Sequence, residues 1–119
     1  MKTIFRAATA AVAALALSMG AARADMATGS EIGEALSGMT LQGSMTEAGF
    51  AEYYAEDGSV AGDGYGGKWR IVGDDVCFVY EGTPESCWTV EMNGPAITLY
   101  KDGEVDGVGM LIEGNPNEF

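Results

Sequence analysis

The chain has 119 residues, with 18 aspartates and glutamates, six lysines and arginines and no histidine, for a formal net charge of −12. This acidity excludes nucleic acid as a partner, because nothing in the chain could neutralise a run of phosphates, and it disfavours anionic membrane surfaces for the same reason. Without histidine, serine and cysteine nucleophiles lack the base they most often use, and only carboxylate or lysine chemistry remains. We therefore expect a protein that is not an enzyme and that carries no cofactor.

Residues 1–24 are typical of an export signal, with a basic start, an apolar stretch over 7–19 and an A-x-A cleavage site at 22–24. Removing them takes away three of the six cations and none of the carboxylates, so residues 25–119 carry a formal charge of −15. Their length fits a single domain. The sequence thus predicts a periplasmic or secreted protein with no membrane span after cleavage.

One short helix is expected over 28–38. Ser30 is a suitable N-cap, and Gly38 is a suitable terminator. The apolar positions fall on one face of that helix, namely Ile32, Ala35 and Leu36.

Everything after the helix has a period of two, which indicates strands. The predicted strands are 39–45, 50–55, 59–62, 68–72, 76–81, 86–92, 96–101 and 108–113. The turn signals between them include Asn93-Gly94 and Asp102-Gly103. Consecutive short strands with tight turns favour an all-β fold, a small antiparallel up-and-down β-barrel or curled sheet of 7–8 strands.

Alternation along these strands predicts which side chains fill the interior, and glycines within a strand, such as Gly107 and Gly109, suggest bends or bulges. The predicted interior residues are Trp69, Ile71, Val76, Phe78, Tyr80, Trp88, Val90, Met92, Ile97 and Leu99. Charged residues predicted to face water are Lys68, Arg70, Glu81, Glu91 and Lys101.

The two cysteines favour a structural disulfide. A hairpin centred on Gly82 places Cys77 opposite Cys87 and Val76 opposite Trp88, and opposed strand residues are close enough for a disulfide. Exported proteins with an even cysteine count usually pair them. A metal site would need further soft ligands that the sequence lacks.

Two weaker patterns have structural alternatives. Asp102, Glu104 and Asp106, followed by Glu113, approximate a calcium-loop spacing, but the surrounding strands favour a β-turn at Asp102-Gly103 instead. The formal G-x-G-x-x-G over 62–67 lacks the strand-to-helix context of a nucleotide site and is expected to be a flexible loop.

The aromatic residues could line a pocket at a barrel mouth or could simply form the core. If a pocket exists, the candidates for binding a small apolar ligand are Trp69, Tyr80, Trp88 and Tyr100.

Five segments carry a resemblance to a known group: "LSGMTLQG", "FAEYYAEDGSVAG", "GGKWRIVGDDVCFVYEG", "SCWTVEMNG" and "GEVDGVGMLIEGNP". Together they resemble small exported bacterial proteins with a lipocalin-like β-meander, over about residues 37–116. Gly67-Lys68-Trp69 is similar to the G-x-W of lipocalins. The shared motifs are turn glycines and strand aromatics, so the resemblance implies a fold and no catalytic residue.

The expected function is that of an exported, acidic, non-enzymatic β-domain that binds a small ligand or a protein. The first alternative is an inhibitor or binder of a cationic enzyme such as lysozyme, since the acidity would steer the chain towards a basic partner. The second is weak calcium binding through the loop at Asp102, Glu104 and Asp106.

Overall fold

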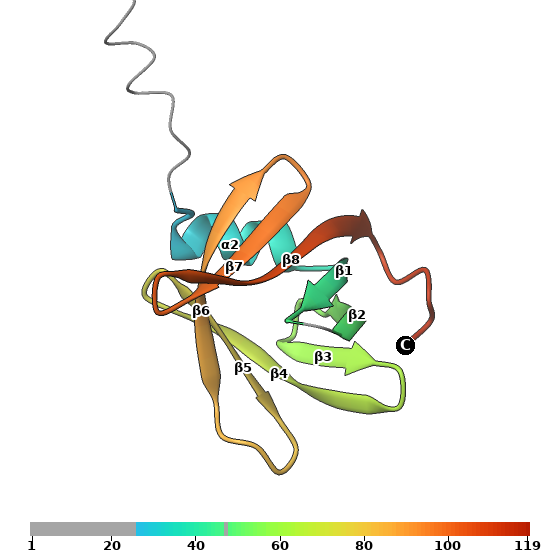
Figure 1. The fold of residues 1–119 in the computed structure, drawn as a ribbon. Coiled ribbons are helices and arrows are strands. Elements are labelled where there is room, and N and C mark those ends of the chain that lie inside the picture. The colour runs from blue at the N-terminus through green and yellow to red at the C-terminus, as the bar shows by residue number, and fades with distance from the viewer. Residues whose placement is uncertain (1–25, 47) are drawn as a thin grey trace, which may run out of the picture.

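The computed structural model describes residues 26–46 and 48–119, where a short helix precedes eight antiparallel strands that close into a barrel (Figure 1). Each strand pairs with the next, and the last returns to pair with the first, so the predicted up-and-down barrel is confirmed. The expected export signal lies outside the described residues. The elements are α2 (Gly29–Leu36), β1 (Met39–Met45), β2 (Ala48–Tyr54), β3 (Ser59–Gly62), β4 (Tyr65–Val72), β5 (Asp75–Tyr80), β6 (Ser86–Asn93), β7 (Ala96–Lys101) and β8 (Glu104–Glu113).

Helix α2 begins with a capping box, and its N-cap lies two residues before the one that was predicted. The N-cap is Thr28, not Ser30, because the Thr28 side chain accepts from the Glu31 backbone while the Glu31 carboxylate accepts from the Thr28 backbone. The Gly29 N–H donates to the Asp74 carboxylate at 2.8 Å, which ties the start of the helix to the β4–β5 turn.

The core is the one that strand alternation predicts. All ten predicted interior residues belong to it, six of them buried and four partly buried against the rest. The helix adds Ile32 and Leu36, which are 0% and 4% exposed. Leu41, Tyr54 and Val60 complete it from the first three strands.

The barrel closes between β1 and β8 because glycines allow the two strands to approach. Gly43 lies opposite Gly109, and a Cβ atom at Gly43 would sit 1.9 Å from the Val108 carbonyl oxygen. Any larger residue there would push the closing strands apart.

A β-bulge interrupts the pairing of β7 with β8. Leu99 pairs with Gly107 and Tyr100 pairs with Val105, so Asp106 is the extra residue on β8. The predicted bend or bulge near Gly107 is therefore present, and it places Asp106 where its side chain can reach β6.

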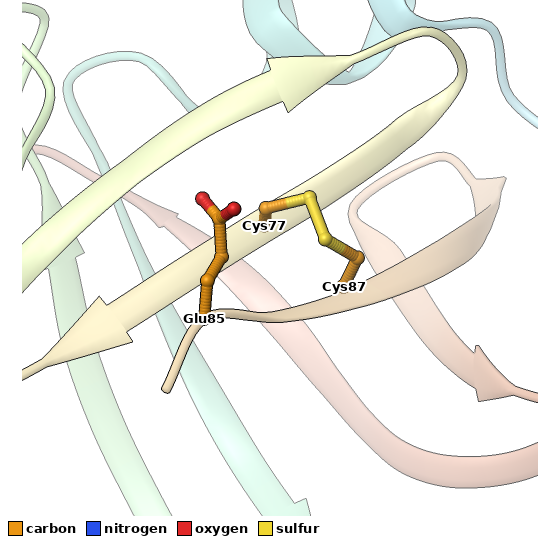
Figure 2. A group of neighbouring side chains, drawn as sticks. All are labelled: Cys77, Glu85 and Cys87. Carbon is orange, nitrogen blue, oxygen red and sulfur yellow. A yellow bond between two sulfur atoms is a disulfide. The ribbon is translucent and has the colours of Figure 1, made fainter. Parts of the chain in front are cut away.

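The β5–β6 hairpin has the predicted register. Val76 pairs with Trp88, and Cys77 pairs with Cys87. The two cysteines form a disulfide whose Cα atoms are 4.0 Å apart, and Figure 2 shows the bond joining the two neighbouring strands. A disulfide is consistent with an oxidising location outside the cytoplasm.

The barrel has two unlike ends. Helix α2 packs where β4 ends and β5 begins, and we call this the helix end. Because neighbouring strands run in opposite directions, the opposite end gathers the last residues of β1, β5 and β7 and the first residues of β2, β4 and β6. We call it the open end, and in Figure 1 the β5–β6 hairpin extends from it, away from α2.

Among the described residues, no helix combines the length and the apolar character that crossing a bilayer requires.

Candidate functional site

A cavity of about 290 Å³ lies inside the open end of the barrel. Its walls come from six strands, and they are apolar or aromatic apart from one carboxylate and the tyrosine hydroxyls. The lining residues are Met45, Phe50, Glu52, Tyr54, Tyr65, Phe78, Tyr80, Trp88 and Leu99.

Strand alternation explains why these side chains meet. Phe50, Glu52 and Tyr54 occupy every second position of β2 and therefore share its inner face. On β5 the same holds for Phe78 and Tyr80. The interior face of each strand thus runs from the packed core into the cavity.

Glu52 is the carboxylate of the cavity, and it is only 7% exposed. It accepts hydrogen bonds from three tyrosine hydroxyls, with Tyr54 donating to Oε1 at 3.0 Å and Tyr65 donating to Oε2 at 2.6 Å. Tyr80 donates to both oxygens at 2.9 Å. In each of these contacts a tyrosine hydroxyl donates and a Glu52 oxygen accepts, so both oxygens of the carboxylate are engaged as acceptors.

No cation among the described residues pairs with Glu52. The ion pair found among residues 26–46 and 48–119 is that of Arg70 with Glu85, on the outer face. Within the part of the chain that the structure describes, neutral hydroxyls are therefore the groups that hold the Glu52 carboxylate, and no counterion faces it.

The environment of the cavity raises the pKa values of all three tyrosines. Burial raises the pKa of Tyr54 well above its usual value, and the neighbouring Glu52 charge raises it further. Burial, followed by the contact with Glu52, also raises the pKa of Tyr65 and of Tyr80. The hydroxyls consequently remain donors across the physiological pH range.

The aromatic rings form a continuous wall. The Phe78 ring centroid lies 5.6 Å from those of Tyr54 and Trp88, and the Tyr80 ring lies 5.8 Å from that of Tyr65. Such edge and tilted pairs stabilise the wall without filling the space in front of it.

Trp88 lines the cavity and lies between two charged side chains. Its Nε1 donates to Asp106 Oδ2 at 2.8 Å, which is the contact that the β-bulge permits. The Lys101 ammonium lies 4.5 Å from the centre of its ring and donates to the Cys87 carbonyl at 3.0 Å. Lys101, which was predicted to face water, has the same parity along β7 as the buried Ile97 and Leu99 and lies against the indole instead.

Of the four predicted ligand-binding aromatics, the structure brings together Tyr80 and Trp88, and both line the cavity. Trp69 is buried deeper, where its Nε1 donates to the Ala55 carbonyl at 2.9 Å. Tyr100 lies on the outer face, and its hydroxyl donates to Glu91 at 2.6 Å.

The residues that match the calcium-loop spacing lie on the β7–β8 hairpin. Asp102 and Gly103, both with positive φ, form the two-residue turn that leads from β7 into β8. Asp102 and Glu104 are exposed, while Asp106 is bound to Trp88. In the part of the chain that the structure describes, these three carboxylates form no group that converges on one point.

Cys77, Glu85 and Cys87 do bring potential ligand atoms within 4.8 Å of one another (Figure 2). The two sulfurs are bonded to each other, however, and Glu85 binds Arg70 through two contacts of 2.7 Å. The Arg70 guanidinium lowers the pKa of the Glu85 carboxyl. This cluster is thus a structural bridge beside an ion pair.

Sequence reasoning missed Glu52 and Tyr65 as site residues. Glu52 lies two residues from both Phe50 and Tyr54, and this spacing was the available signal. Tyr65 was assigned to a flexible loop, yet β3 ends at Gly62 and β4 begins at Tyr65. The G-x-G-x-x-G is therefore a tight hairpin that points Tyr65 towards Glu52.

Comparison of the chain with protein-family models, with curated proteins and with solved structures found no match.

Proposed function

We propose that this is an exported, non-enzymatic binding protein that holds a small, largely apolar ligand in the cavity at the open end. The observation that carries the proposal is the cavity itself, with about 290 Å³ inside a closed barrel and a mainly aromatic wall. Ligand sites in proteins usually occupy ~300–1,000 Å³. A dry cavity of ~150 Å³ already accommodates benzene, so the ligand is a small molecule.

Two features support a binding role rather than catalysis. The chain has no histidine, and the one carboxylate that lines the cavity is already engaged by three hydroxyls. A general base needs a free lone pair within reach of the proton it removes.

The expected export signal and the disulfide together support a location in the periplasm or outside the cell. The resemblance to small exported proteins with a lipocalin-like meander agrees with this assignment.

The test measures binding of a neutral fluorescent probe, N-phenyl-1-naphthylamine, to the periplasm-purified protein. Native mass spectrometry of the same protein detects any small molecule that is already bound. We expect saturable probe binding that is insensitive to salt. Met45→Trp, which narrows the cavity, should weaken binding several-fold, whereas Met92→Trp, at a partly buried methionine outside the cavity lining, should not. Equal binding by both variants would contradict the proposal.

A second candidate function is supported by the outer surface. Most of the described carboxylates are exposed, and the exposed cations among the described residues are Lys68 and Arg70, of which Arg70 is paired. Such a surface fits a cationic protein partner, for which lysozyme is a suitable probe. Capture that weakens as ionic strength rises supports this function, and capture that ignores salt contradicts it.

A further inference from the structure

We propose that the cavity selects a small organic cation, meaning an ammonium group carried on an apolar body. This inference rests on the binding function proposed above and names the class of ligand. It comes from three observations on the cavity: a buried carboxylate that has no counterion among the described residues, a wall of aromatic faces, and the repulsion that this carboxylate would exert on an anion.

The first observation is the uncompensated charge of Glu52. A buried carboxylate is expensive even when it is hydrogen-bonded, because neutral donors do not replace a counterion. With 7% exposure, Glu52 has little access to solvent ions except through the cavity. A cation entering the cavity would supply the missing charge in a medium of low dielectric constant, where the attraction is strongest.

The second observation is the chemistry of the wall. Six of the nine lining side chains are aromatic, and the face of an aromatic ring attracts a cation. Lys101 already shows this attraction, because its ammonium lies 4.5 Å from the ring centre of Trp88, a residue of the cavity wall. The deeper rings around Glu52 have no such cation among the described residues.

The third observation concerns anions. A carboxylate ligand would be placed beside Glu52 in an apolar cavity, whereas the Asp106 and Lys101 charges beside Trp88 offset each other. Like charges at such sites repel strongly, so an anionic ligand such as a fatty acid is disfavoured. A neutral ligand would fill the space but would leave the Glu52 charge as it is.

The test compares benzylamine, benzyl alcohol and benzoate at pH 7 by isothermal titration calorimetry. The three share one ring and similar size but are cationic, neutral and anionic. We expect benzylamine to bind at least about tenfold more tightly than benzyl alcohol, and benzoate to bind most weakly. Benzyl alcohol or benzoate binding as tightly as benzylamine would overturn the cation inference and leave the binding function intact. Failure of all three ligands and of the naphthylamine probe would overturn both.

Two variants test whether Glu52 causes the preference for benzylamine over benzyl alcohol. Glu52→Gln should remove the advantage of benzylamine over benzyl alcohol. Glu91→Gln should keep it, because Glu91 also accepts from one tyrosine but lies outside the cavity lining, and the change in net charge is the same. If Glu52→Gln does not fold, Lys101→Met serves instead. Removing the ammonium that lies against the Trp88 ring should tighten benzylamine binding, and weaker or unchanged binding would overturn the inference.

Discussion

The two ends of the barrel are built from the same eight strands, yet they are filled differently. At the helix end, α2 inserts Ile32 and Leu36, and the neighbouring Val76 and Ile97 are 0% and 2% exposed. At the open end no helix of residues 26–46 and 48–119 enters, and the strands leave a cavity beside Glu52. The contrast indicates that close packing at the helix end stabilises the fold. This stability offsets the cost of the buried carboxylate and the cavity at the open end.

The largest effect on stability is expected from a large-to-small substitution in the core at the helix end. Ile32→Ala should lower the free energy of unfolding by ~2–5 kcal/mol, because it opens a cavity in close-packed surroundings. Met45→Ala should cost clearly less, since that side chain already borders open volume. Urea denaturation of both variants measures the difference, and equal losses would contradict the division of roles.

The disulfide joins β5 to β6 within the hairpin that extends from the open end. Replacing Cys77 and Cys87 together by serine should lower the free energy of unfolding by about 2.8 kcal/mol, the chain-entropy value for a loop closed over ten residues of separation. Calorimetric or urea unfolding of the double variant gives the value. An unchanged midpoint would show that the unfolded chain gains no freedom when the bridge is lost.

Tyr80 and Tyr100 compare a tyrosine inside the open end with one outside. Tyr80→Phe should cost about 2 kcal/mol, because it removes a donor from a buried charge. Tyr100→Phe removes a hydrogen bond to Glu91 on the outer face, where water can replace it, and should cost clearly less than Tyr80→Phe. Urea unfolding of the pair tests whether burial makes the difference.

Alkaline pH should act on the open end through its tyrosines. The pKa values of Tyr54, Tyr65 and Tyr80 are raised by burial, and those groups ionise near pH ~10 once unfolded. Between the pKa of the unfolded tyrosines and the raised pKa of the folded ones, the native state binds more protons than the unfolded state. The stabilisation from these groups is therefore fully present below pH ~10 and falls as the pH rises further. Tyrosinate absorbance should therefore increase together with unfolding. Full titration of all five tyrosines near pH 10 in a folded barrel would contradict this.

Calcium should have the smallest effect. Asp102, Glu104 and Asp106 lie along a hairpin rather than around a point, so millimolar calcium should leave the melting temperature unchanged. A rise reversed by a chelator would restore the calcium alternative.

Much of the fold could be predicted because its signals are local. The position of Gly82 alone set the register that pairs Cys77 with Cys87. Alternation within each strand identified the interior side chains, since the side-chain period of a strand is two residues. Thr28 was missed as the N-cap because Ser30 is equally suitable by residue type, and only the reciprocal contacts with Glu31 distinguish them.

The site was harder to predict because its contacts join distant residues. Glu52 and Tyr80 are 28 residues apart and meet only after the barrel closes. Both faces of β2 carry apolar residues, so alternation could not say that Glu52 points inwards, and a glutamate is normally placed in water. Trp69 and Trp88 looked alike in the sequence, but Trp88 lines the cavity, whereas Trp69 is buried and donates to the Ala55 carbonyl.

These two tryptophans also give the protein a built-in optical readout. The Trp69 indole is bound to the Ala55 carbonyl in the core, whereas the Trp88 indole stands between the Lys101 ammonium and the Asp106 carboxylate beside the cavity. Indole emission depends on the local electric field, so a charged guest would shift the emission of one tryptophan and leave the other as an internal reference. Occupancy could then be followed without attaching any dye.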